Sequence, residues 1–258
     1  MTDNDGNVWL AGVDGCPGGW IVVFGRPGGE VMSPRVVTTF AEIAFSDRRP
    51  AVIAIDMPIG LPKRSPAKGR LAECAVRRLL GDRKSSIFRI PSRRAVEASV
   101  AAKPADERQR FFHACKIARE TSDDGKAFSK QSFYILDKVM EVDTFLQSHR
   151  EFIPRVFETH PELAFWRMNG GEPLSEPKKR KNRNHPPGLE LRRSLLKRAG
   201  IPKPLLYERA PKGAADDDMM DAFACLITAR HIHGKRARSY PEPLPQPDEF
   251  GLPMAIWG

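Results

Sequence analysis

Cysteine is scarce in this sequence and does not occur in metal-binding or disulfide patterns. The 258 residues include four cysteines, far apart along the chain, and no Cys-x-x-Cys pair. They are Cys16, Cys74, Cys115 and Cys225. Neither a structural zinc site nor a disulfide framework is therefore predicted, and the reduced thiols of a cytoplasmic protein are expected.

Long apolar runs are also absent. No stretch approaches the roughly 18 apolar residues of a membrane-spanning helix. Residues 1–6 are acidic and polar, without the basic and apolar segments of a secretory signal. We therefore expect no membrane insertion, no secretion and a cytoplasmic location. The chain is 41% hydrophobic, which at this length is enough for a sizeable core.

The positive charge is concentrated in two segments. The formal net charge is +10, yet residues 62–94 alone carry eleven Lys and Arg against two acids. Residues 178–198 carry nine against one, so the remainder of the chain is acidic. The two segments predict a site for a polyanion if they converge in space. Charge alone is equally consistent with basic helices and loops that only face solvent.

Hydrophobic patterns predict a sheet followed by alternating strands and helices. Apolar runs at residues 8–14 and 20–24 flank a Gly-rich turn and predict a hairpin, which a strand at residues 31–39 extends to an antiparallel meander. Residues 51–56 read AVIAID, the pattern of a strand buried on both faces, and a further strand is predicted at 154–158. Helices are predicted at residues 40–45, 71–80, 93–102, 106–120, 130–149, 161–168, 189–199 and 216–233.

This order predicts an α/β protein with a five-stranded mixed sheet. Residues 7–56 and 153–258 would form its core. The intervening residues 57–152 are too long for a simple crossover and predict a basic helical insertion. Residues 170–187, rich in Gly, Pro and Lys, predict a flexible loop, and residues 241–258 predict a Pro-rich tail.

Acidic residues stand where the predicted strands end. Asp14 ends the first strand, Asp56 the fourth and Glu158 the fifth. Because the carboxyl ends of neighbouring parallel strands face one crevice, these three side chains are expected to meet there. Taken singly, each is also a residue type that ends a strand in a turn.

The last predicted helix carries a stronger signal. Residues 219–229 read MMDAFACLITA, which is apolar on every side and predicts a buried helix with Asp221 inside it. A buried carboxylate is costly unless it is paired or bound to a metal. Asp218 lies three residues earlier on the same face, whereas we assign Asp217 to capping the helix. Carboxylates at this density suit Mg²⁺ or Mn²⁺.

Other residues of the first basic segment offer phosphate or base contacts. Ser85 and Ser86 lie among cations and predict either phosphate binding or helix capping. Phe88 next to Arg89, with Arg93 nearby, is a combination that can clamp single-stranded nucleic acid, although core packing is favoured for Phe88. For His160 we favour a hydrogen-bonded structural role over proton transfer.

Four segments together resemble a known family. They are GVDGCPGGW at residues 12–20, IDMPIGL at 55–61, FETHPE at 157–162 and DDMMDA at 217–222. They resemble a family of uncharacterised, mostly bacterial proteins described as predicted nucleases of the RNase H fold, and the likeness covers nearly the whole chain. The basic stretch at residues 83–93 is also similar to that family, and Asp218-x-x-Asp221-Ala is similar to the terminal helix of RuvC-type junction resolvases.

The resemblance implies a fold and a set of site residues. It implies a mixed sheet with the first acid on the central strand. It implies Asp14, Asp56, Asp218 and Asp221 as metal ligands, with Glu158 as a further catalytic acid specific to this family. Asp56 replaces the Glu of the resolvases, which shortens its reach by one methylene. The nucleic-acid contacts would come from the basic stretch, at Arg83, Lys84, Ser85, Ser86, Arg89 and Arg93.

Together these features predict a metal-dependent nuclease that hydrolyses phosphodiesters by a two-metal mechanism. One alternative is a catalytically silent nucleic-acid-binding or scaffold protein with the same fold. Another is a phosphotransferase of the actin and sugar-kinase type, whose phosphate loop also follows a first strand with Asp-Gly. The chain has no Walker loop and no second Asp-Gly hairpin at Glu158, which disfavours the phosphotransferase. DNA, RNA, a hybrid of the two and a small nucleotide all remain open as the substrate, and the oligomeric state is open.

Overall fold

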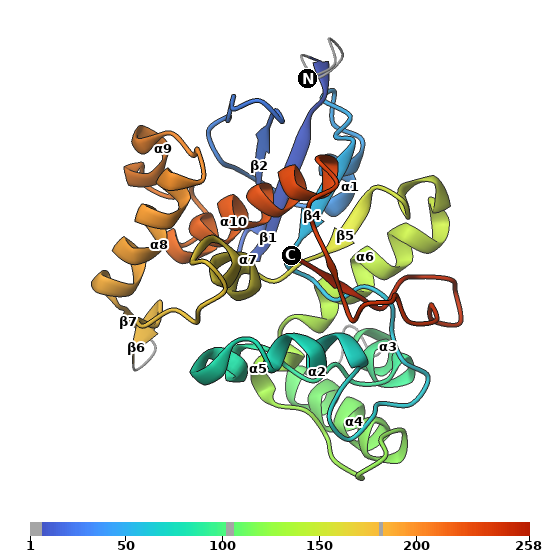
Figure 1. Ribbon diagram of the computed structural model, residues 1–258. Coiled ribbons are helices and arrows are strands. Elements are labelled where there is room, and N and C mark those ends of the chain that lie inside the picture. Colours follow the sequence, from blue (N-terminus) through green and yellow to red (C-terminus); the bar gives the residue numbers. More distant parts are fainter. Residues whose placement is uncertain (1–6, 102–105, 181–182) are drawn as a thin grey trace.

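The computed structural model describes residues 7–101, 106–180 and 183–258, and its centre is a five-stranded mixed sheet (Figure 1). The strands lie in the order β3-β2-β1-β4-β5. The meander β1 to β3 is antiparallel, whereas β4 and β5 run parallel to β1. The strands are β1 (Leu10–Cys16), β2 (Gly19–Gly25), β3 (Arg35–Val37), β4 (Val52–Ile55) and β5 (Val156–Glu158). The predicted five-stranded mixed sheet is confirmed.

The edge strand β3 is shorter than predicted. A strand was expected over residues 31–39, but regular pairing spans only Arg35–Val37, and Val31 makes an isolated bridge to Gly25. Pro34 lies between the two paired parts and has no N–H to donate, so a continuous ladder cannot run through it.

Alternation along β1 directs its side chains to the two faces of the sheet. Leu10, Gly12 and Asp14 point to one face, whereas Ala11 and Val13 point to the other. The first face is covered by α10 (Asp216–His233), with α7 (Pro161–Met168), α8 (Pro186–Arg198) and α9 (Lys203–Tyr207) around it (Figure 1). The helix α9 has no counterpart among the predicted elements. Phe165 and Phe223 are fully buried in this layer.

The second face is covered by α1 (Phe40–Ala44) and α6 (Leu136–Ser148). The rings of Trp20 in β2 and Phe40 pack edge to face with their centroids 6.0 Å apart, and those of Phe40 and Phe145 in α6 pack with their centroids 5.0 Å apart. Such pairs stabilise the packing beyond the area that they bury. The sheet is therefore enclosed between two helical layers.

The described part of residues 57–152 contains helices joined by loops, and most of it lies to one side of the sheet. The helices are α2 (Leu71–Arg77), the 3₁₀ helix η2 (Gly81–Ser86), α3 (Arg93–Ala101), α4 (Glu107–Glu120), α5 (Lys130–Phe133), α6 and the 3₁₀ helix η3 (Arg150–Phe152). Figure 1 shows α2 to α5 grouped below the sheet. The single helix predicted at 130–149 is two helices, because the N–H of Ile135 bonds to Ser132 in a tight turn.

Residues 170–187, where the sequence predicts a flexible loop, contain regular structure. A short hairpin pairs β6 (Lys179–Arg180) with β7 (Arg183–Asn184). The helix α8 begins at Pro186, where the missing N–H of proline costs nothing, rather than at the predicted residue 189.

The C-terminal residues, where a Pro-rich tail is predicted, pack onto the rest of the chain. The strand β8 (Ser239–Tyr240) pairs with β9 (Ile256–Trp257), which also bridges to Thr159 beyond β5. Asp248 is buried and accepts hydrogen bonds from the N–H groups of Leu61 and Leu252, both at 2.9 Å. Buried anchors between the prolines thus fix this segment in place.

Among the helices of the described residues, none has the length and apolar character that crossing a membrane requires.

Candidate metal centre

Three carboxylates from three elements converge at one edge of the sheet. Asp14 projects from β1 toward α10, and Asp56 directly follows β4, where its N–H donates to the carbonyl of Val13 at 2.9 Å. Asp221 lies in α10 with 2% of its surface exposed. Each offers an oxygen such that the three oxygens lie within 4.8 Å of one another. We call Asp14, Asp56 and Asp221 the acid triad.

A glycine on β1 permits this convergence. A Cβ at Gly12 would lie 2.7 Å from the Cα of Leu226 and closer still to backbone atoms of Leu226 and Ala222. Only glycine therefore allows α10 to lie so close to β1. Asp221 precedes Ala222, so the same close approach brings its carboxylate to Asp14.

The acid triad is electrostatically unfavourable without a cation. Burial, followed by the charges of Asp56 and Asp221, raises the pKa of Asp14 well above its usual value. Burial and the Asp221 charge raise the pKa of Asp56 to about 8, and burial also raises the pKa of Asp221. Neighbouring carboxylates with raised pKa values favour a bound cation, and a set of carboxylate oxygens fits Mg²⁺ or Mn²⁺. The residues present therefore fit the predicted metal.

Lys178 supplies positive charge to the acid triad, a role that the sequence analysis did not predict. It directly precedes β6, and its ammonium donates to the Oδ2 of Asp221. Burial lowers the pKa of Lys178, but the charges of Asp221 and Asp14 outweigh this effect and raise it overall. Lys178 is therefore protonated at neutral pH and partly compensates the triad.

Asp218 takes the capping role that the sequence suggests for Asp217, and neither of the two belongs to the acid triad. Asp218 accepts a hydrogen bond from the N–H of Ala215 at 2.9 Å and so caps α10, outside the acid triad. Asp217 is 2% exposed, with its Oδ2 2.6 Å from the Nζ of Lys179. Its Oδ1 is buried and has no hydrogen-bond partner within the described ranges. Residues 217 and 221 are four apart and share a helix face as readily as 218 and 221, so spacing alone could not separate them.

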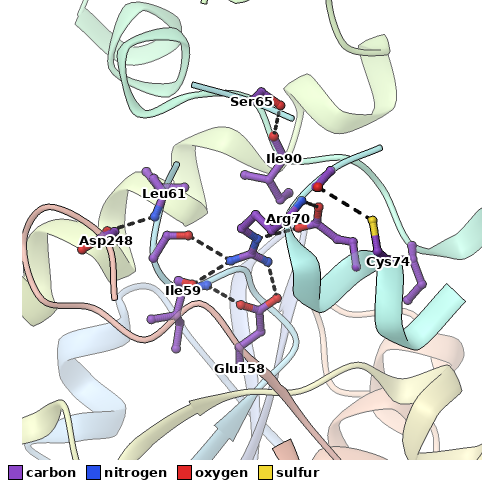
Figure 2. Close-up of polar contacts among 12 residues, drawn as sticks. Ile59, Leu61, Ser65, Arg70, Cys74, Ile90, Glu158 and Asp248 are labelled. Atoms are coloured by element: carbon purple, nitrogen blue, oxygen red, sulfur yellow. Dashed lines mark hydrogen bonds and ion pairs between the residues drawn. The ribbon is translucent and has the colours of Figure 1, made fainter. Parts of the chain in front are cut away.

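Glu158 lies in a buried ion-pair network rather than in the acid triad (Figure 2). Its carboxylate accepts from Arg70 Nη2 at 2.6 Å and from the N–H of Ile59 at 2.8 Å. Arg70 also bonds to Glu73 at 2.6 Å and to the carbonyls of Ile59 and Gly60 at 2.7 and 2.9 Å. Burial raises the pKa of Glu158 to about 7, although Arg70 opposes the shift. The network fixes the loop that follows Asp56.

A cavity of about 390 Å³ opens beside the acid triad. Asp14, Asp56 and Glu158 line it together with Lys138, whose side chain lies against Gly15. His160 also lines it and caps α7, where its Nδ1 accepts from the N–H of Glu162 at 3.2 Å. Burial lowers the pKa of His160 to about 4, so the imidazole is neutral at pH 7. The site therefore holds a carboxylate cluster next to a space that one lysine faces.

Two predicted nucleic-acid contacts have intramolecular partners. Arg93 is 3% exposed and pairs with Asp143 at 2.6 Å and Asp248 at 2.7 Å, so its charge is already satisfied inside the fold. Arg89 pairs with Asp124 at 2.8 Å and is mostly covered. Net charge in a sequence does not reveal which cations are paired.

The other predicted contacts lie in η2. Lys84 and Ser85 are exposed, and Ser86 lines the cavity. Arg83 donates to the carbonyl of Leu174 at 3.4 Å, which joins η2 to the segment that leads to Lys178. The first basic segment therefore lines the cavity, and the second begins at Lys178, which contacts the acid triad.

The buried pair Arg192 and Glu162 anchors the segment that carries Lys178. Arg192 is fully buried, and its Nη2 donates to Glu162 Oε1. Its Nη1 donates to the carbonyls of Glu176 and Gly188 at 3.1 and 3.0 Å. Because Arg192 lies in a basic run, the sequence suggested a charge that faces a polyanion. Its role in the structure is instead to hold the residues before Lys178 against α7 and α8.

Comparison with known proteins places the chain in one family. The model of the family described as "Protein of unknown function (DUF429)" matches residues 12–246, so the chain belongs to that family. The matched region contains every residue of the acid triad, Lys178 and Glu158. No curated protein and no solved structure matches the chain.

Proposed function

We propose that this protein is a metal-dependent nuclease that hydrolyses nucleic-acid phosphodiesters at the acid triad. The observation that carries the proposal is the convergence of Asp14, Asp56 and Asp221 to within 4.8 Å, beside a cavity and two basic segments. Asp14 and Asp221 are buried, and Lys178 offsets the repulsion within the triad only in part, because the pKa values of all three acids stay raised; a divalent cation makes the arrangement favourable.

The topology supports an RNase H-like fold for this nuclease. The sheet order is β3-β2-β1-β4-β5, with Asp14 on the central strand and Asp56 at the end of its parallel neighbour. Asp221 comes from the long helix α10, which packs on that sheet. The resemblance of the sequence implies the same placement of acids. Topology supports the fold, and the acid triad supports the activity.

The residues of the site divide the chemistry between them. Asp14, Asp56 and Asp221 would hold Mg²⁺ or Mn²⁺. Asp217, one turn before Asp221 on α10, has an Oδ1 without a partner among the described residues and would be a candidate ligand for a second ion. When bound, such ions acidify a water molecule and stabilise the leaving oxygen of a phosphodiester. Lys138 faces the cavity and can neutralise a substrate phosphate. Phe88, which also lines the cavity, offers a ring on which a base can stack.

The test combines metal binding with cleavage. Mg²⁺ and Mn²⁺ are titrated by calorimetry into the wild type and into Asp221→Asn, and both proteins are assayed on labelled single-stranded, duplex, hybrid and branched substrates. A matched control is Asp123→Asn, which removes an exposed carboxylate paired with Arg64, far from the triad in the chain.

We expect the wild type and Asp123→Asn to bind metal and to cleave at least one substrate, and Asp221→Asn to do neither. Metal binding without cleavage of any substrate by the wild type would favour a silent binding protein. No metal binding even with nucleic acid present would overturn the proposal.

A further inference from the structure

A second cleft lies at the opposite end of α10 from the acid triad. Its volume is about 750 Å³, and the ends of α7, α8 and α10 and the loop after β2 surround it. Arg230 in this cleft is nine residues beyond Asp221, or about 13 Å along the helix. The cleft is therefore separate from the candidate metal centre.

Basic side chains dominate the lining of this cleft. We call it the arginine cleft, after Arg167, Arg198, Arg230 and Arg236, which line it together with His231. Among the described residues that line it there is no Asp or Glu. Within the same described part of the chain, none of the four arginines forms an ion pair with an acidic side chain. No acidic side chain in the described part of the chain therefore offsets this concentration of charge.

Arg230 is the most buried arginine of the described cleft lining, and no acidic side chain of the described residues pairs with it. It is 8% exposed, and its Nε donates to the carbonyl of Arg26 at 3.1 Å. Its Nη1 makes no hydrogen bond within the described ranges and lies beside Gly200, another residue of the cleft lining. Burial alone lowers the pKa of Arg230. A buried guanidinium satisfied only by carbonyl groups is unfavourable, and an anion from solution would relieve it.

Neighbouring groups strengthen the same field. Arg167 donates to the backbone oxygens of Gly258 and Arg236 and has no acidic side chain as partner among the described residues. Burial and the charges of Arg167 and Arg236 lower the pKa of His231 to about 4. The two arginine charges thus add to the effect of burial at this point in the cleft.

The loop after β2 leaves space for a ligand. It contributes Gly28 and Gly29 to the lining, and a Cβ at either position would meet nothing within 4 Å. Gly29 has φ +125°, a backbone conformation that favours glycine. The rim opposite the arginines is thus bare backbone that a bulky anion can approach.

We propose that the arginine cleft binds a small molecule that carries at least two phosphate groups. Guanidinium groups bind phosphate through two parallel hydrogen bonds. Arg167 and Arg230 already donate part of their N–H groups to backbone oxygens, but the four positive charges together still exceed what a single phosphate needs. The volume is within the range of sites for cofactor-sized ligands and is larger than an inorganic ion requires. The site is independent of the proposed nuclease activity.

The test uses pyrophosphate as the probe, with a chelator present so that no metal links it to the acid triad. Calorimetry compares the wild type with Arg198→Gln/Arg236→Gln, which removes two exposed arginines of the cleft. The matched control, Lys197→Gln/Arg238→Gln, removes two exposed cations that neighbour these residues in sequence but do not line the cleft. A further variant, Asp221→Asn, alters the metal centre alone and so shows whether pyrophosphate binding depends on it.

We expect saturable binding to the wild type and to Asp221→Asn, weakened at least about tenfold in the cleft variant and within about twofold in the control. Tighter binding of a nucleoside diphosphate than of pyrophosphate would support the proposal and add a base contact. Arg230→Gln should also lose binding, with thermal unfolding used to verify that it folds.

Three results would overturn the proposal. They are no saturable binding of pyrophosphate or nucleoside diphosphate to the wild type, equal losses in the cleft variant and its control, and binding of an oligonucleotide alone that both double variants weaken equally.

Discussion

The ammonium of Lys178 donates a hydrogen bond to the carboxylate of Asp221 inside the acid triad. The proposed metal would need the same Asp221 carboxylate as a ligand. The negative charge of Asp14 also attracts the Lys178 ammonium and raises its pKa. Lys178 is one-third exposed and directly precedes the short hairpin of β6 and β7. The two cations are therefore alternatives, and withdrawal of Lys178 leaves the triad free to bind a metal.

Replacing Lys178 should make metal binding tighter and the metal-free protein less stable. In Lys178→Gln the triad loses its internal cation, which we expect to lower the free energy of unfolding by about 1–3 kcal/mol in a chelator and to tighten Mg²⁺ or Mn²⁺ binding about tenfold. Calorimetry and urea unfolding measure both effects. The control is Lys179→Gln, because Lys179 pairs with Asp217 and not with the triad. Weaker or unchanged metal binding in Lys178→Gln would show that Lys178 does not compete.

Asp218 should contribute to stability and not to metal binding. Its carboxylate caps α10, so Asp218→Ala is expected to cost about 0.5–2 kcal/mol of unfolding free energy. Metal affinity measured by calorimetry should stay within a few-fold of the wild type, whereas Asp221→Ala should lose it. If Asp218→Ala abolishes metal binding at an intact fold, Asp218 is a ligand, as the family resemblance implies.

The sequence predicted the sheet and the main acids because these rest on local patterns. The short apolar run at residues 51–56 and the long, all-round apolar stretch that contains Asp221 are local signals of a buried strand and a buried helix. Asp14 and Asp56 follow from the rule that parallel strands end at one edge of the sheet. That edge is where the structure places them.

Other features depend on pairings distant in sequence, which no local pattern shows. Arg93 and Arg192 lie in basic runs, but Asp143 and Glu162 neutralise them across 50 and 30 residues. Glu158 ends its strand as predicted, yet Arg70 determines its role. Lys178 lies in a segment rich in Gly, Pro and Lys, whose composition predicts disorder and conceals its contact with Asp221.

Gly12 should be intolerant of substitution. In Gly12→Ala the added Cβ would meet the backbone of α10, so the helix must move away from β1. Overpacking of this kind costs about 1–3 kcal/mol or more, and it also separates Asp221 from Asp14. The temperature of thermal unfolding and the metal affinity measured by calorimetry should both fall. Gly28→Ala is the control, since a Cβ there meets nothing within 4 Å. Normal metal binding by a stable Gly12→Ala protein would contradict this account of the β1 and α10 contact.

The buried pair of Arg70 and Glu158 should contribute strongly to stability and affect metal binding only indirectly. Arg70→Met leaves Glu158 and Glu73 buried without their cation, which is expected to cost about 3–5 kcal/mol. Adding Glu158→Gln should recover part of that loss, because one uncompensated charge is removed. A double-mutant cycle by urea unfolding gives the coupling energy. Glu158→Gln alone should keep its affinity for Mg²⁺, whereas loss of that affinity would make Glu158 a ligand.

Asp56 should contribute a loss of stability to the metal-free protein as the pH rises. The pKa of Asp56 is about 8 in the folded state and far lower in an unfolded chain, so its protonated form favours the fold. This contribution is complete below the unfolded pKa and is lost as the pH rises through the folded pKa, with a slope of up to about 1.4 kcal/mol per pH unit. Asp56→Asn has no such group and should show a smaller slope.

The measurement is urea unfolding of both proteins between pH 5 and pH 8 in a chelator, followed by tryptophan fluorescence. Taking the difference between the wild type and Asp56→Asn cancels the titration of groups that the substitution leaves unchanged. As the pH rises, the free energy of unfolding of the wild type should fall relative to that of Asp56→Asn. Saturating Mg²⁺ should reverse the trend for the wild type, because the metal binds the ionised triad. Parallel pH profiles in the chelator would show that Asp56 ionises normally and that the triad carries no excess charge for a metal to relieve.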